Sequence, residues 1–114
     1  MNIQLYALKK NFEVQKAERF LKERRIPYQF VDLKKHRLGK RELELFARPH
    51  GVRALIDLED EAVKSHPIAY TTDSNRMIEY LMEQPRFLRT PLIRDGNRVM
   101  VGFDEQVMLS WISP

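Results

Sequence analysis

Residues 3–33, IQLYALKKNFEVQKAERFLKERRIPYQFVDL, contain the pattern that decides the fold. Their first positions alternate between apolar and polar residues, which indicates a short strand with one buried face. Asn11 can cap a helix that follows, and Pro27 ends this helix because it excludes the preceding residue from the helical region. Residues 28–33 then predict a second strand. Since about a dozen helical residues connect the two strands, we expect a parallel βαβ unit.

The predicted helix has two distinct sides. Its apolar side chains recur at helical spacing and form a stripe for the core, which comprises Val14, Ala17, Phe20 and Leu21. On the other side, residues of opposite charge stand four positions apart, the spacing of neighbours on a helix surface. We therefore expect exposed ion pairs between Glu18 and Lys22 and between Arg19 and Glu23.

The middle of the chain, about residues 39–86, predicts helices rather than strands. A short helix with an apolar face ends at the sequence Pro-His-Gly, residues 49–51. Residues 52–72 are less regular, and their first part favours one broken helix. A clearer helix spans residues 73–83 and stops before a proline.

The last third predicts a hairpin and a closing helix. In PLIRDGNRVMV, residues 91–101, two short apolar runs are joined by Asp95-Gly96, the strongest short-range hairpin signal. Asp104 can cap the final helix. The order is βαβ, a helical stretch and ββα. It predicts an α/β, thioredoxin-like fold with a mixed four-stranded sheet and a helical insertion, about residues 39–86, between its halves.

The composition fits one domain covering residues 1–114, with 43% hydrophobic and 32% charged residues. The chain has no cysteine, which excludes disulfides, thiol catalysis and thiolate metal sites. No apolar run approaches the roughly 18 residues of a membrane span, and the N-terminus does not resemble a signal peptide. We therefore expect a cytoplasmic protein. We expect no metal and no cofactor, because no phosphate loop occurs and the three histidines are too widely spaced, namely His36, His50 and His66.

Positive charge is concentrated in the first half of the chain. Residues 1–57 hold 14 Lys and Arg against 7 Asp and Glu, and residues 58–114 hold 6 against 9. Such asymmetry marks either a solvated face or a surface for an acidic partner. The densest run comprises Lys34, Lys35, Arg37, Lys40 and Arg41. It lacks the stacking aromatics or groove-reading helix of nucleic-acid binders, so a protein is favoured as its partner over direct nucleic-acid binding.

The two ends of the sequence resemble the arsenate reductase family, which includes the Spx transcription regulators. Members carry a Pro-x-Leu-Leu-x-Arg-Pro-[Ile/Leu] stretch, a hairpin and a Val-Gly-[Phe/Tyr]. The matching positions here are Pro85, Leu88, Pro91, Gly102 and Phe103. The family's first helix and second strand are similar to QKAERFLKERRIPYQFVDLKK, through Lys16, Ala17, Leu21, Ile26, Pro27 and Tyr28. The family's insertion helix resembles LGKRELELFARPHG, residues 38–51.

The resemblance implies an active site whose reactive groups are missing from this chain. The family's redox cysteine falls on Asn11, and its second cysteine or serine falls on Val14. Its three oxyanion-binding arginines fall on Thr90, near Asp57 and near Val101, while its cis proline falls on Pro91. We therefore expect no catalytic residue and a degenerate pocket that comprises Lys9, Lys10, Asn11, Val14, Asp57, Thr90 and Pro91.

Two hypotheses of function follow. The first is a family member without redox chemistry of its own, a regulatory or protein-binding module that uses the basic run. RNA polymerase is the partner that the likeness to Spx implies. The second is a reductase-like or glutaredoxin-like protein that keeps a small-anion or glutathione site at the start of the first helix, with Lys9 and Lys10 as its cations. For Asn11 itself, a helix cap is the simpler role.

Overall fold

The computed structural model describes residues 1–113. Its centre is a mixed sheet in the order β2-β1-β3-β4. Strand β1 (Ile3–Ala7) pairs in parallel with β2 (Tyr28–Asp32) and antiparallel with β3 (Leu92–Asp95). Strand β4 (Arg98–Val101) completes the hairpin with β3. The predicted βαβ and ββα halves are therefore confirmed.

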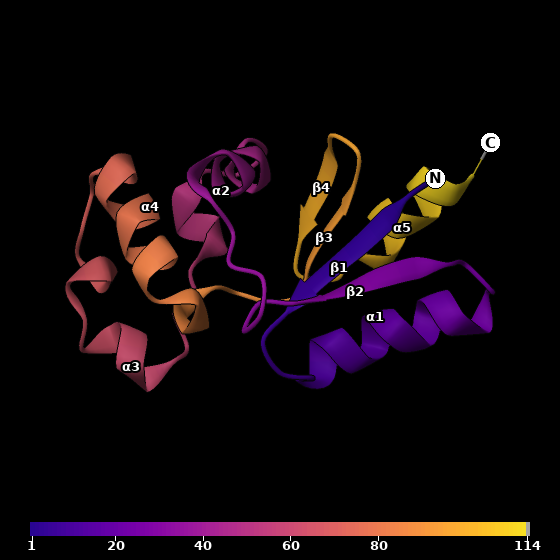
Figure 1. Cartoon of the computed structure of the whole chain (residues 1–114), viewed down its shortest axis with the longest axis horizontal. Helices are drawn as coiled ribbons and strands as arrows, with labels where there is room; N and C mark the ends of the chain where they lie inside the picture. Colours follow the sequence, from indigo (N-terminus) through magenta and orange to yellow (C-terminus); the bar gives the residue numbers. More distant parts are fainter. Residues whose placement is uncertain (114) are drawn as a thin grey trace.

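One face of the sheet is covered by helix α1 (Phe12–Glu23) and helix α5 (Glu105–Ile112), as Figure 1 shows. Because successive strand residues point to opposite faces, every second residue of β1 packs under these helices. The resulting core includes the predicted stripe of α1 and buries Ile3, Leu5, Ala7, Val14, Ala17, Leu21, Ile93, Met100, Met108 and Trp111.

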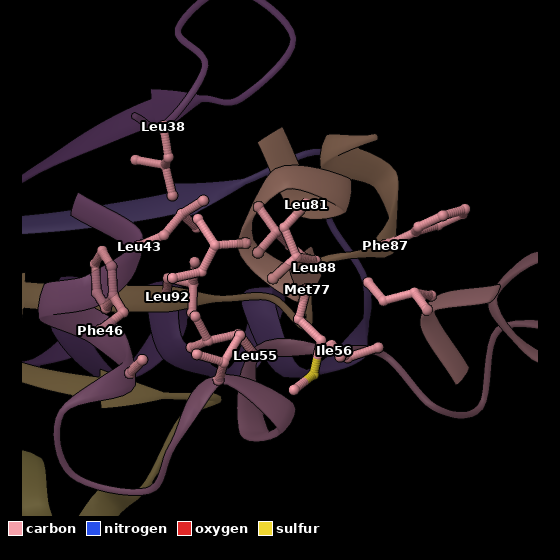
Figure 2. Close-up of a cluster of buried hydrophobic side chains, with 14 of the residues drawn as sticks. Leu38, Leu43, Phe46, Leu55, Ile56, Met77, Leu81, Phe87, Leu88 and Leu92 are labelled. Carbon is pink, nitrogen blue, oxygen red and sulfur yellow. The ribbon is translucent and has the colours of Figure 1, made fainter. Parts of the chain in front are cut away.

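The helical insertion lies at one end of the sheet (Figure 1). It contains α2 (Lys40–Ala47), α3 (Glu61–Lys64) and α4 (Ser74–Glu83), with the short 3-10 turns η1 (Val52–Leu55), η2 (Pro67–Ala69) and η3 (Pro85–Phe87) between and after them. These elements share a second core with the sheet. Figure 2 shows it, with Leu43, Phe46, Leu55, Met77, Leu81 and Leu92 among its side chains.

In place of the broken helix favoured for the start of residues 52–72, the structure has two separate short elements, η1 and α3. After η1, Ile56 adopts an extended conformation and forms an antiparallel bridge with Leu88. Asp60 then caps α3 by accepting a hydrogen bond from the N–H of Ala62 at 2.9 Å. The chain leaves the helical path here because its backbone pairs with a segment far away in the sequence.

The expected surface pair Glu18–Lys22 is wrong. Glu18 is only 7% exposed, and its carboxylate contacts the ammonium of Lys10 at 3.1 Å and accepts a hydrogen bond from the hydroxyl of Tyr28. Burial raises the pKa of Glu18, but the hydrogen bonds from Tyr28 and Lys10 outweigh it, so the pKa is lowered overall. Burial and the Glu18 carboxylate together raise the pKa of Tyr28. Glu18 therefore lies on the buried side of α1 and points toward Tyr28 of β2.

Among residues 1–113, none of the helices combines the length and the apolar character that a bilayer crossing requires.

Candidate functional site

Asn11 joins the start of α1 to the segment that precedes β3. Its Oδ1 accepts a hydrogen bond from the N–H of Val14 at 2.8 Å and thereby caps α1. Its Nδ2 donates to both the carbonyl oxygen and the hydroxyl of Thr90, each at 3.2 Å. Both ends of the amide are therefore used within the protein.

The segment that receives Asn11 contains a cis peptide bond between Thr90 and Pro91. The carbonyl of Pro91 accepts a hydrogen bond from the N–H of Gly102 at 2.8 Å, so the segment is also joined to the end of the hairpin. Thr90 is only 9% exposed. The cis proline implied by the family resemblance is thus present beside the start of α1.

A third segment, residues 55–57, closes the site from the side of the insertion. The carbonyl of Leu55 accepts from the N–H of Arg89 at 2.7 Å, and the N–H of Asp57 donates to the carbonyl of Phe87 at 2.8 Å. These bonds flank the bridge between Ile56 and Leu88. Together the three segments enclose a cleft of about 500 Å³, lined by Asn11, Glu13, Arg53, Ala54, Ile56, Asp57, Leu58, Glu59, Arg89 and Thr90.

The structure corrects the expectation that no guanidinium group remains at this site. Arg89 and Arg53 both line the cleft, and Arg89 precedes Thr90 directly in the sequence. Family spacing placed the expected arginine on Thr90 itself and therefore missed its neighbour. No sequence motif identifies Arg53 as a residue of this site, because it lies in the irregular residues 52–72. It reaches the cleft only because residues 55–57 pair with residues 87–89.

Both guanidinium groups already have partners in the protein. Arg89 lies 3.5 Å from the carboxylate of Glu13, which also accepts a hydrogen bond from the N–H of Phe103 at 2.7 Å. Arg53 donates to the carbonyl of Thr71 at 2.7 Å. The lining adds the carboxylates of Asp57 and Glu59 to that of Glu13, so carboxylates outnumber arginines in the cleft.

Of the two lysines predicted for the pocket, Lys9 lies beside the cleft and Lys10 points away from it. Lys9 lines a smaller hollow of about 280 Å³ beside the cleft, which Asn11, Asp57 and Thr90 also line. Lys10 points elsewhere, since its ammonium pairs with Glu18 and lies 5.2 Å from the ring centre of Phe30. It is therefore not part of the cleft.

Two of the mapped positions are structural. Val14 is fully buried in the core beneath α1. Val101, where the third arginine was expected, pairs with Leu92 in the hairpin and packs partly buried against the second core. Neither side chain lines the cleft.

The sequence model of the ArsC family matches residues 6–110. The chain belongs to the ArsC family. No curated protein sequence matches it.

Solved structures show the same fold at low sequence identity. The YFFB (PA3664) protein is 22% identical, with a TM-score of 0.87 over 97% of this chain and 99% of its own. An arsenate reductase (ArsC) related protein from Brucella melitensis is also 22% identical, with a TM-score of 0.73 over 100% of this chain and 97% of its own. Arsenate reductase from Vibrio cholerae is 16% identical, with a TM-score of 0.82 over 96% and 97%. The ArsC-family chain thus has the thioredoxin-like fold of these proteins.

The basic run of this ArsC-family chain forms an exposed loop between β2 and α2 that continues into the first turn of α2. We call its five cations, Lys34, Lys35, Arg37, Lys40 and Arg41, the basic loop; all five are exposed. Leu38, which is 5% exposed, anchors the loop in the second core. Within the described residues, none of the five cations has a carboxylate within 4.0 Å.

The histidines of this ArsC-family chain are dispersed. His66 caps η2, where its Nδ1 accepts a hydrogen bond from the N–H of Ile68 at 3.0 Å, and its ring packs against Tyr80 and Phe87. His36 lies on the basic loop, 3.9 Å from Glu42. Over residues 1–113, no three metal-ligating side chains converge on one point.

Proposed function

We propose that this ArsC-family chain performs no thiol redox chemistry of its own and acts by binding another protein. The observation that carries the proposal is the state of Asn11. It occupies the position that the family resemblance gives to the redox cysteine, and its amide links α1 to Thr90. An amide neither ionises nor attacks an oxyanion. The residue at the nucleophile's position therefore only connects α1 to Thr90 through hydrogen bonds.

The charges of the cleft support the same proposal. An oxyanion needs unpaired cations or N–H groups directed at it. Here Arg89 is paired with Glu13, and Asp57 projects a further negative charge into the same space. A bound arsenate would have to displace Glu13 from Arg89 and would still face the carboxylate of Asp57. Both requirements weaken binding.

A second function has one specific observation in its favour. Arg53 and Arg89 line the same cleft as the N-terminus of α1, where backbone N–H groups favour anions. A small-anion or glutathione site at this position would make the chain a partner in a reaction whose sulfur comes from another molecule. This function requires the two arginines to set the affinity for the anion.

An activity assay and an affinity measurement separate the two functions. With arsenate and either glutathione or glutaredoxin, the binding module gives no turnover. Phosphate affinity, measured by calorimetry, should not change in an Arg53→Ala/Arg89→Ala variant, and Lys16→Ala serves as the matched control on the exposed side of α1. Turnover by the unmodified chain, or phosphate binding that the double variant abolishes, favours the second function.

The basic loop is the surface that we assign to the protein partner. Its five cations are exposed and lack nearby carboxylates in the part of the chain that the structure describes. Since the sequence resembles the Spx regulators, RNA polymerase is the first partner to test. Purified polymerase should bind the unmodified chain. It should bind more weakly to a variant in which all five cations of the basic loop are changed to Gln. Equal binding of both proteins would remove the loop from this role.

A further inference from the structure

A groove of about 600 Å³ lies on the face of the sheet opposite α1. Strand register places Gln4 between Gln29 of β2 and Arg94 of β3, so the three side chains project from the same face. The loop after β2 and the start of α2 form the wall of the groove. The groove is lined by Gln4, Tyr6, Gln29, Phe30, Val31, Asp32, Lys35, His36, Glu42 and Arg94.

The floor of this groove is polar and only partly covered. Helix α2 covers the end of the face around Tyr6, whose ring packs edge-on against Phe46 at 5.6 Å between centres. Farther along β1, Gln4 is half-buried and Gln29 is exposed. Gln4 Oε1 accepts a hydrogen bond from the hydroxyl of Tyr6 at 3.2 Å, and Gln4 Nε2 donates to Gln29 Oε1 at 3.4 Å, a long contact. Each amide nitrogen carries two N–H groups, so the second N–H of Gln4 and the amide nitrogen of Gln29 can still donate to a ligand.

The groove is lined by two carboxylates, Asp32 and Glu42, and by two cations, Lys35 and Arg94. Asp32 accepts a hydrogen bond from the N–H of Lys34 at 2.9 Å. Glu42 accepts from the N–H of Gly39 at 3.3 Å and lies near His36. In the part of the chain that the structure describes, neither carboxylate forms an ion pair with Lys35 or Arg94, so both cations can still pair with a ligand.

One cation lies on the wall of the groove and the other on its floor. Lys35 belongs to the basic loop and is exposed on the wall. Arg94 projects from the floor, where its Nε donates to the carbonyl of Gly96 at 3.1 Å. Four more exposed cations of the basic loop continue this positive surface beyond the groove, namely Lys34, Arg37, Lys40 and Arg41.

We propose that this groove binds an acidic, extended segment of the partner protein. The inference rests on the proposed function and specifies where and what the partner contacts. Acidic side chains of the segment pair with Lys35 and Arg94, and its backbone exchanges hydrogen bonds with the amides of Gln4 and Gln29. The rest of the basic loop attracts the segment at longer range.

The aromatic residues of the sheet argue against a nucleic acid in this groove. A single strand needs exposed rings on which its bases stack. Tyr6 is only 2% exposed, because α2 covers it. Phe30 belongs to the edge strand that lines the groove, but it stands opposite Leu5 in the register. Its ring therefore packs on the face that α1 covers, 5.2 Å from the ammonium of Lys10. The floor therefore offers amides and a guanidinium group but no stacking surface.

The test is an NMR titration of the full chain with an oligo-glutamate peptide of about eight residues, which spans roughly 25 Å when extended. We expect the backbone signals of Gln4, Gln29 and Arg94 to shift. Lys35→Glu should weaken binding by about tenfold or more, because it brings like charges together. Lys16→Glu makes the same change of charge on the exposed side of α1 and should leave the affinity unchanged.

A second variant tests the floor of the groove. Arg94→Gln removes the charge while retaining a hydrogen-bonding side chain, and it should also weaken binding. If only Lys35→Glu acts and the signals of Gln4 and Gln29 stay in place, the groove is excluded and the basic loop alone binds.

The remaining outcomes also overturn the inference. One is that the peptide does not bind at low salt. Another is that only the backbone signals of Asn11 and Arg89 shift. A third is that a single-stranded oligonucleotide binds equally tightly and shifts the same signals as the peptide. Arsenate turnover by the unmodified chain would contradict the proposed function, whatever the result of the peptide titration.

Discussion

The side-chain amide of Asn11 donates to the carbonyl and to the hydroxyl of Thr90, at 3.2 Å each, while its oxygen caps α1. Two segments that are far apart in the sequence are thus joined by one side chain. In a redox enzyme of this fold the same position would need a free, reactive atom. Here the position contributes to stability instead.

Asn11→Ala should destabilise the protein by about 1–2 kcal/mol, because it removes both the helix cap and the bonds to Thr90. Urea denaturation at neutral pH measures this free energy of unfolding. Asn75→Ala is the matched control, since Asn75 is exposed in the first turn of α4, and Asp73 provides the cap there. Equal stability of the Asn11→Ala variant and the wild type would show that the connection is not needed.

Asn11→Cys should create a thiol with a pKa below the ordinary value of about 8.5, because the N–H groups and dipole of α1 stabilise the thiolate. The pH dependence of alkylation by iodoacetamide measures it. Asn97→Cys, in the exposed turn of the hairpin, should react with an ordinary pKa. Identical pKa values for the two thiols would contradict the placement of Asn11 at the start of α1.

Glu18→Gln should lower stability at pH 7 by about 1–2 kcal/mol, because a charge-assisted contact with Lys10 is lost. The pKa of Glu18 is lowered in the folded protein. Its stabilisation is therefore present above the ordinary carboxyl pKa, about 4.3, and is lost as the pH falls through the lower folded value. The difference from the wild type should shrink below about pH 4. Unfolding curves at several pH values test this, with the exposed Glu23→Gln as control.

Gly102→Ser should destabilise the protein by about 1–2 kcal/mol. Gly102 has a φ of +76°, and a Cβ atom there would lie 2.6 Å from Arg89 Nη2 and 2.7 Å from Glu13 Oε1. Gly39→Ser is the matched change at a helix cap with a φ of −85° and no heavy atom within 4 Å of the added Cβ, so it should be neutral or slightly stabilising. Melting temperatures of the two variants compare them, and an equal effect would contradict the left-handed conformation of Gly102.

The parts of the fold that the sequence predicts are those with local signals. Asn11 before an apolar stripe, Pro27 after it and the Asp95-Gly96 turn each act within a few residues. The structure confirms the elements that they define. Local propensity and tertiary packing agree at these positions, so the pattern and the fold coincide.

The parts that could not be predicted depend on contacts between distant residues. The bridge between Ile56 and Leu88 converts an expected helix into an extended segment and brings Asp57 to the cleft. Glu18 has the spacing of a surface pair, yet Tyr28 and Lys10 draw it toward β2. Arg89 is missed because family spacing points to its neighbour Thr90, and because its partner Glu13 lies far away in the sequence, on α1.

We propose that this ArsC-family chain has no redox activity of its own. The most direct measurement is the steady-state rate of arsenate reduction by the purified chain, supplied with glutathione and glutaredoxin and followed through NADPH-coupled glutathione reductase. We expect a rate equal to that of the mixture without the chain. A rate that rises in proportion to the concentration of the chain, and that falls in the Arg53→Ala/Arg89→Ala variant, would contradict it.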